Sequence, residues 1–467
     1  MRLPLGLLLT ALLTRSLGPR GLGEYATVFA LVALYQGVFN DVGLSSIVLR
    51  EISRRPEGRT AIIVSAAALQ AVVAGVTYGL LLAGVAIIHY PSDIAIAVAL
   101  FGLSLLLTPL DILSLPFTAD LKLAKLIPPS LIGIALNFGL VAGSLAMHAR
   151  LPLIVSAALV ATLIQYAIVA HISLQGLAPL TRPSRAPWRW LLVESLPLAA
   201  NSVLAAFMLQ APLLYLSHLS FSEAGLFNAA NRLPQQLILM PFAIRATTFP
   251  LLARSWHLDR RAFSDQLIRT VAVTLMVGVP LTVGGLGLAS LLVSVLFGTR
   301  FAAAGLTLQL LLVVFALQFP YIILAEALIA TGHQRVNLWL SVGTVPLLIC
   351  GLVVGANAAG AVGAAMALVA YNTVLLSLTL LAARSRLGRT NVVGDIALAM
   401  LVLLIGVLVE RKLAGSSGTG ASQGTAAMAG AIVAGLLMVA LHRDIGLIVV
   451  RESTAALRQA TGHARTG

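Results

Sequence analysis

Polar sequence is scarce in this chain, and that scarcity decides the class of protein. Charged residues make up only 10% of the 467 residues, whereas hydrophobic residues make up 59%. The mean hydropathy of +1.00 lies far above that of soluble domains. Residues 61–88 contain no charge and, at about 1.5 Å per residue, are long enough to cross about 30 Å of hydrocarbon. Lipid offers backbone amides no partner, so the sequence predicts a polytopic helical membrane protein.

Other absences narrow the function further. The single cysteine, Cys350, excludes an internal disulfide and a thiolate metal site. No phosphate-binding loop or His-Glu-x-x-His motif occurs, so we expect no catalytic residue, metal or cofactor. The net charge of +14 would suit nucleic acid in a soluble protein, but these basic residues are spread through loops. We therefore expect membrane lipids as partners and no nucleic acid.

The apolar stretches predict about fourteen transmembrane helices. The predicted spans are residues 3–18, 24–49, 60–88, 92–117, 123–147, 151–177, 191–217, 225–252, 266–297, 304–331, 336–356, 360–383, 393–410 and 425–447. The longest polar stretch before the tail, residues 180–190, predicts a cytoplasmic linker. It separates a six-helix bundle over 1–179 from a second over 191–385, and residues 386–467 add two transmembrane helices and a cytoplasmic tail. The predicted fold is all-α, with the two six-helix bundles in a pseudo-two-fold relation.

A short motif recurs in the two predicted halves. Residues 21–26 precede the second span and residues 224–229 begin near the eighth, and both contain a glycine two positions before an aromatic residue. Repeated halves around a central pathway are common in secondary transporters. Most Lys and Arg fall in loops on one side if the N-terminus is cytoplasmic, which predicts that both termini are cytoplasmic.

Several segments, in order along almost the whole chain, resemble the Wzx-like polysaccharide flippases of the multidrug/oligosaccharidyl-lipid/polysaccharide exporter superfamily. They are residues 14–26, 41–44 with Arg50 and Glu51, 194–198, 224–233, 249–254, 296–301 and 330–333. The resemblance implies a bacterial plasma membrane protein that moves an undecaprenyl-diphosphate-linked oligosaccharide to the outer leaflet. It also implies glycosyltransferases and a polysaccharide polymerase as partners. The chain departs from the family at Gln210 to Pro212, where many members have an acidic residue.

Cationic side chains inside the bundle are the expected means of binding a diphosphate. An arginine at the centre of a helix costs about 2.5 to 3.5 kcal/mol on insertion scales and is seldom left facing lipid. The eighth span contains two, Arg232 and Arg245, and Asn228, Arg232 and Gln235 share one face at i, i+4 and i+7. These four residues are the predicted substrate site. The alternative is that the arginines extend to lipid headgroups, which we expect of Arg269.

Three acids lie furthest inside apolar stretches: Asp41, Asp111 and Glu326. Buried carboxylates bind a proton or sodium, or pair with arginine, so these residues are predicted either to couple transport to an ion or to form structural pairs. Asp41 ranks first because it matches the family's acid-x-Gly-Leu pattern. Seven amides suit a cavity for sugar hydroxyls or, alternatively, hydrogen bonds between helices: Gln70, Asn137, Gln165, Asn201, Gln210, Gln309 and Gln318.

Three rival functions remain open. A cation-coupled multidrug antiporter of the same superfamily is the nearest, although the basic interior favours an anionic substrate. A polysaccharide polymerase or ligase is less favoured, because such enzymes typically carry a large external loop and every predicted external loop here is short. A purely structural membrane protein is the most distant.

Overall fold

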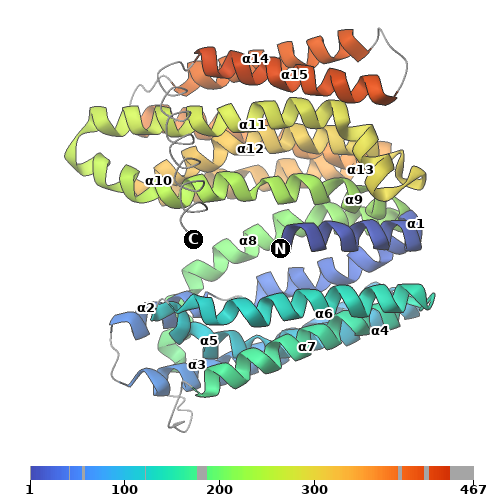
Figure 1. Ribbon diagram of the computed structural model, residues 1–467. Helices are drawn as coiled ribbons and strands as arrows, with labels where there is room; N and C mark the ends of the chain where they lie inside the picture. The colour runs from blue at the N-terminus through green and yellow to red at the C-terminus, as the bar shows by residue number, and fades with distance from the viewer. Residues whose placement is uncertain are drawn as a thin grey trace, which may run out of the picture. The chain divides into compact units, whose positions relative to one another are not determined.

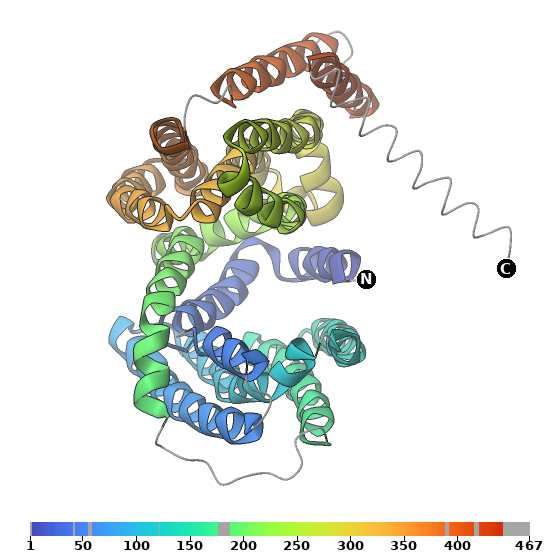
Figure 2. The same cartoon turned by 90° about the vertical axis from the view of Figure 1, so that its left-hand side faces the viewer.

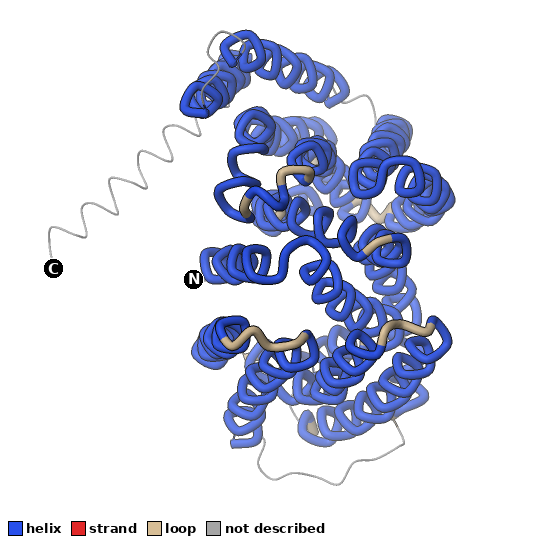
Figure 3. The backbone as a smooth tube through the Cα atoms, turned by 90° about the vertical axis from the view of Figure 1, so that its right-hand side faces the viewer, coloured by secondary structure: helices blue, strands red, loops and turns tan. Residues whose placement is uncertain are grey.

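The computed structural model describes residues 2–40, 43–54, 58–120, 122–175, 187–387, 392–414 and 420–441. Every regular element in these ranges is a helix, and none is a strand (Figure 3). Eleven helical stretches in these ranges are long and apolar enough to cross a membrane. The predicted all-α polytopic membrane fold is therefore confirmed.

The chain divides into two compact units, Met1–Ala229 and Ala230–Gly467. The first unit holds α1 (Arg2–Tyr35), η1 (Gln36–Asn40), α2 (Leu44–Arg54), α3 (Arg59–Ile88), α4 (Ser92–Gly102), η2 (Leu103–Leu107), α5 (Pro109–Ala119), η3 (Leu123–Leu126), α6 (Ile127–Ala146), α7 (Leu151–Gln175), α8 (Trp188–Leu219) and the start of α9 (Phe221–Leu237). The second holds the end of α9, α10 (Leu239–Leu258), α11 (Arg260–Phe297), η4 (Thr299–Phe301), α12 (Ala304–Ala330), α13 (Gln334–Leu387), α14 (Val392–Ala414) and α15 (Gly420–Leu441).

The fifteen labelled α-helices of the described ranges can be matched to the fourteen predicted spans. The helices α1 and α13 each contain a break and count as two, the pairs α4 with α5 and α9 with α10 each count as one, and the short α2 is left out. Within each unit the long helices run roughly side by side, as views across them and nearly along them show (Figure 1, Figure 2).

The boundary between the units falls inside α9, between Ala229 and Ala230. The preceding helix, α8, packs against α1, η1 and α2 and so belongs to the first unit. The linker predicted at residues 180–190 lies earlier in the chain and falls mostly in residues 176–186, outside the described ranges. The division into six-helix bundles at that linker therefore remains a prediction.

The breaks in α1 and α13 coincide with the predicted gaps between spans. Gly18 in α1 has φ 67°, a left-handed value that glycine adopts without a Cβ clash, and Pro19 follows it. In α13 the break lies at Ala359 and Gly360. Gly355 and Gly363 contact each other across this break through backbone atoms, so the two halves of α13 pack as an antiparallel hairpin.

Proline explains two further interruptions. The 3₁₀ segment η2 ends at Leu107, and α5 begins at Pro109, two residues before Asp111. The predicted eighth span bends at Ile238, between Pro234 and Pro241, where α9 ends and α10 begins. Because proline has no N–H and crowds the carbonyl four residues earlier, two of them so close together prevent a straight helix.

The second predicted span, residues 24–49, is not one regular helix. It becomes π-helical over Gln36–Asn40, and the separate helix α2 begins at Leu44. The apolar face of α2 is buried against α3, α5 and α8, while Arg50 and Arg54 are exposed. A helix of eleven residues is too short to span a bilayer. The sequence predicts one continuous helix over 24–49, whereas the structure has two separate helical stretches.

The C-terminal helices share the hydrophobic core of the second unit. Ile396 and Val402 of α14 and Met438 of α15 belong to the same cluster as Val279 and Val283 of α11. Small residues permit the approach: Gly406 of α14 lies against Val283, and Gly435 of α15 lies near Pro280. The two helices predicted as an addition are therefore packed on α11.

The two copies of the recurring motif cross each other inside the first unit. A Cβ on Gly23 of α1 would overlap the carbonyl oxygen of Phe221, and a Cβ on Gly225 of α9 would overlap that of Pro19. Gly23 thus faces Phe221, four residues before Gly225, and Gly225 faces Pro19, four residues before Gly23. This reciprocal contact agrees with the repeat inferred from the sequence and requires glycine at both positions.

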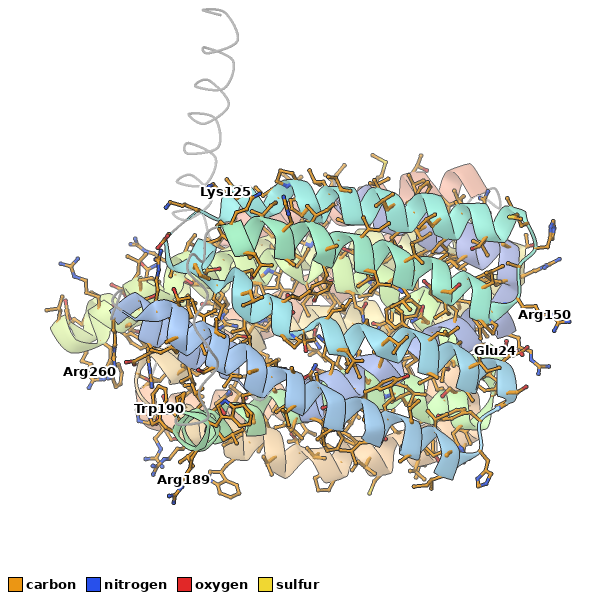
Figure 4. All side chains as sticks on the ribbon, turned by 90° about the horizontal axis from the view of Figure 1, so that it is seen from below. Glu24, Lys125, Arg150, Arg189, Trp190 and Arg260 are labelled. Carbon is orange, nitrogen blue, oxygen red and sulfur yellow. The ribbon has the colours of Figure 1, made fainter. Side chains whose placement is uncertain are left out.

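Charged side chains in the first unit gather at the ends of its helices (Figure 4). Lys125 and Arg189 lie at one end, whereas Glu24 and Arg150 lie at the other. The predicted topology places Lys125 and Arg189 on the same side of the membrane and Arg150 on the opposite side. The helix directions in the first unit agree with that alternation.

Candidate substrate-binding site

An ion pair joins two of the predicted site residues within the second unit. The Nε of Arg245 on α10 lies 2.7 Å from Oε2 of Glu326 on α12. The Glu326 side chain is only 8% exposed, whereas that of Arg245 is 42% exposed. Its guanidinium also lies 5.7 Å from the ring centroid of Phe242. The carboxylate is therefore deep between helices, and the cation reaches outward from it.

This geometry leaves part of the guanidinium available. The contact with Glu326 uses Nε, and among the described residues no hydrogen bond is formed by the two terminal amino groups of Arg245. A planar guanidinium presents donors in a fork that matches phosphate oxygens. The sequence identified both residues as candidates but could not show that they contact each other.

The predicted polar stripe of α9 has mixed surroundings. Asn228 is partly buried, and its Oδ1 has no hydrogen-bond partner within the described ranges. Arg232 is partly buried and makes a side-chain interaction, while Gln235 is exposed. Asn228 is near the end of the first unit and the other two begin the second. Their role in substrate binding remains a prediction.

Within the described ranges Asp111, an acid of the first unit, is not paired with an arginine as Glu326 is. Asp111 on α5 accepts a hydrogen bond of 3.0 Å from the hydroxyl of Tyr166 on α7, so its partner is neutral. Asp41 lies outside the described residues. An ion-coupling role for these acids stays a prediction.

Next to Asp41 along the chain, a buried polar network joins η1 and α3 to Thr108, which lies between η2 and α5. The Gln70 Nε2 donates to the carbonyl oxygen of Asn40 at 2.9 Å and to its Oδ1 at 2.6 Å. The Asn40 Nδ2 donates to Oγ1 of Thr108 at 2.9 Å. Asn40, Gln70 and Thr108 are all less than 9% exposed. The irregular backbone at this depth is thus hydrogen-bonded by side chains, as a membrane interior requires.

Sequence reasoning missed Asn40 and Thr108, although an asparagine just before a predicted acid inside an apolar stretch was a usable signal. Gln70, expected either to line a cavity or to bond between helices, bonds between helices. Gln309 and Gln318 do the same, donating to the Leu286 carbonyl and to Asn372. Asn137 and Gln165 instead line a cavity in the first unit.

Gln70→Leu is expected to destabilise the protein by about 1 to 3 kcal/mol, because it leaves buried acceptors of Asn40 without a donor. Thermal unfolding in detergent measures this effect. Gln36→Leu is the matched control, since Gln36 lies on the adjoining turn and is exposed. Equal melting temperatures for the two variants would contradict a structural role for the network.

The described residues contain no group of three or more His, Cys, Asp or Glu that could hold a metal ion. Among the candidate site residues are a partly exposed guanidinium held by a buried acid, a carboxylate hydrogen-bonded to tyrosine, and neutral amides. Such groups are chemically suited to a polar ligand, and their role in binding one stays a prediction.

Comparison with known proteins gives the fold a context. A structure of the lipid II flippase MurJ, in an inward closed conformation, matches with a TM-score of 0.69 at 13% identity, covering 95% of this chain and 97% of that one. An inward-facing multidrug resistance transporter of the MATE family and MOP superfamily matches with a TM-score of 0.65 at 15% identity, covering 83% and 94%. These likenesses show a shared fold. A search of curated proteins finds no significant match.

The sequence itself matches the family described as "Polysaccharide biosynthesis protein" over residues 2–256, more than half of the chain. This match agrees with the resemblance seen in the motifs and with the fold shared with MurJ and MATE transporters. The chain belongs to the polysaccharide biosynthesis protein family.

Proposed function

We propose that this protein is a flippase that moves an undecaprenyl-diphosphate-linked oligosaccharide from the inner to the outer leaflet of a bacterial plasma membrane by alternating access. The family membership and the flippase fold support this function. The observation that carries it is the partly exposed guanidinium of Arg245, held inside a membrane-spanning segment by Glu326.

The substrate's chemistry fits this pair. A diphosphate must cross the hydrocarbon region while its polyprenyl tail stays in lipid, so it needs a cation along its route. The exposed end of the Arg245 guanidinium can donate to phosphate oxygens while Nε stays with Glu326. Glu326 neutralises the arginine when no substrate is bound, which limits the cost of holding a cation in the membrane.

The Glu326 carboxylate also competes with the substrate for the Arg245 guanidinium. A diphosphate that binds Arg245 weakens its attraction to Glu326, and the carboxylate reclaims the cation when the substrate leaves. A site that binds the diphosphate moderately serves transport better than one that holds it tightly, because release belongs to every cycle. Arg232 and Gln235, which belong to the second unit with Arg245, extend the proposed site along α9, and Asn228 on the same helix stays a predicted substrate contact.

The cellular setting follows from the same proposal. Both termini face the cytoplasm, glycosyltransferases supply the lipid-linked glycan, and a polymerase uses it for O-antigen, capsule or exopolysaccharide. A proton or sodium gradient drives the cycle through Asp41, Asp111 or Glu326. The protein itself breaks no covalent bond, in contrast to a polymerase or ligase.

The competing candidate is a multidrug antiporter, favoured by the fold shared with MATE transporters. The two functions differ in the charge of the substrate. Antiporters of cationic drugs need an acid with free charge in the cavity, whereas Glu326 is already paired with Arg245.

Reconstitution in proteoliposomes tests the proposal. A polyprenyl-diphosphate-linked saccharide with a fluorescent sugar is placed in the inner leaflet, and a membrane-impermeant quencher reports its arrival outside. We expect transfer that depends on the protein, and in cells we expect gene deletion to cause lipid-linked oligosaccharide to accumulate on the cytoplasmic side. Transport of a cationic dye without transfer of the lipid-linked sugar would refute the flippase and favour the antiporter.

A further inference from the structure

A polar cavity opens within the first unit. Its volume is about 410 Å³, in the range of small-molecule sites. It lies among the beginning of α1, the middle of α6 and α7, and its lining combines apolar and neutral polar side chains. The residues of the lining are Leu5, Gly6, Leu9, Ser130, Gly133, Ile134, Asn137, Phe138, Ala161, Thr162 and Gln165.

The polar groups face one another from two helices. Ser130 and Asn137 are seven residues apart on α6, which places them on one face, and Thr162 and Gln165 are neighbours on one face of α7. No lining residue carries a charge. The cavity therefore suits a neutral ligand with hydroxyl and amide groups better than a phosphate or a cation.

The two amides are not occupied by the protein. In the described part of the chain, neither Asn137 nor Gln165 has a hydrogen-bond partner, in contrast to Gln70, Gln309 and Gln318. The hydroxyls of Ser130 and Thr162 donate to carbonyls of their own helices and keep acceptor capacity. Two amide groups without partners in an apolar bundle are costly unless a ligand or water satisfies them.

Local packing holds one of these amides in place. Gly133 of α6 is buried beneath Gln165, and a Cβ on Gly133 would overlap the Gln165 amide and come within 2.9 Å of its Cβ. Glycine at this position lets the Gln165 side chain lie against α6 at the cavity wall. Any side chain there would push Gln165 outward.

We propose that this cavity binds a neutral sugar residue of the lipid-linked glycan through its hydroxyl or acetamido groups. This inference rests on the proposed flippase function. The apolar side chains Leu9, Ile134 and Phe138 suit the nonpolar face of a sugar ring, and the amides donate to and accept from its substituents. The cavity then contributes glycan selectivity that the diphosphate site cannot supply.

Two lipids distinguish the sugar from the rest of the substrate: a short-chain polyprenyl diphosphate carrying one N-acetylhexosamine, and the same lipid without sugar. Binding to the full chain in nanodiscs is measured for wild type, Asn137→Leu and Gln165→Leu. We expect each variant to bind the sugar-bearing lipid about tenfold more weakly and the sugar-free lipid with unchanged affinity. Unchanged binding of the sugar-free lipid also shows that the variant is folded.

Gly133→Ala is the second variant, expected to act in the same direction by displacing Gln165. Gln309→Leu is the matched control, because its amide already bonds to the Leu286 carbonyl and is expected to leave sugar discrimination unchanged. Equal weakening for both lipids would overturn the sugar site, as would no weakening for either. Tighter binding of the sugar-free lipid by the leucine variants would overturn it in favour of an acyl-chain site. If wild type binds neither lipid, the proposed flippase function fails as well.

Discussion

Arg245→Ala is expected to slow transfer of a polyprenyl-diphosphate-linked saccharide in proteoliposomes about tenfold to a hundredfold. A hydrogen bond to a charged group contributes about 1.5 to 3 kcal/mol, and each 1.4 kcal/mol is a factor of ten. Arg245→Lys is expected to recover only part of the rate, because an ammonium keeps the charge but cannot present a fork to phosphate. Rates are normalised to the amount of folded protein.

A structural loss must be separated from a functional one, because Arg245→Ala also leaves the buried Glu326 carboxylate unpaired. Breaking a fully buried pair costs about 3 to 5 kcal/mol, and the cost here is smaller because the Arg245 side chain is 42% exposed. The double variant Arg245→Ala with Glu326→Gln removes both charges and is expected to recover stability. Transport is expected to stay lost.

The control for this experiment is Arg269→Ala. Arg269 lies exposed on α11 and has no hydrogen bond or ion pair within the described ranges, as expected of a side chain reaching toward headgroups. Transfer by this variant is expected to match wild type. Recovery of transfer by the double variant at Arg245 and Glu326 would show that the pair is structural and that the diphosphate is bound elsewhere.

The sequence predicts the spans well because the bilayer constrains them locally. Each run must be long enough to cross the hydrocarbon and must satisfy its own backbone amides, so its length and hydropathy are readable without knowing its neighbours. The gaps at Gly18 and Gly360 were found in this way. The change to a π-helix at Gln36 was not, because the partners that bond its last residue, Asn40, come from distant parts of the chain: Gln70 donates to it and Thr108 accepts from it.

The site is less predictable, because the role of each polar residue depends on the side chains of the helix that faces it. Gln70 and Gln165 are the same residue type in equally apolar helices, yet one is bonded in a buried network and the other lines a cavity. The difference comes from the facing helix, which presents Asn40 in one case and Gly133 in the other. Likewise, nothing near Arg245 in the sequence indicates Glu326, because α11 separates them along the chain.

Gly23→Ala and Gly225→Ala are expected to reduce the stability of the folded protein at or above the upper end of the 1 to 3 kcal/mol range for overpacking. The added methyl group of either variant would overlap a backbone carbonyl oxygen, of Phe221 or Pro19 respectively. A flexible side chain could turn away from the methyl, but these carbonyls belong to helices α9 and α1. The helices must therefore separate, which the melting temperature in detergent measures.

Gly79→Ala is the matched control, because it makes the same substitution inside α3, where nothing lies within 4 Å of the added Cβ. Alanine is a better helix former than glycine by about 0.8 to 1 kcal/mol, so this variant is expected to melt at or above the wild-type temperature.

The double variant of Gly23 and Gly225 is expected to lose less stability than the sum of the two single losses, because one separation of the helices relieves both overlaps. Additive losses would show two independent contacts instead of one reciprocal crossing of the repeated motif. Wild-type melting of either single variant would show that the crossing tolerates a side chain and that the motif is conserved between the halves for some reason other than packing.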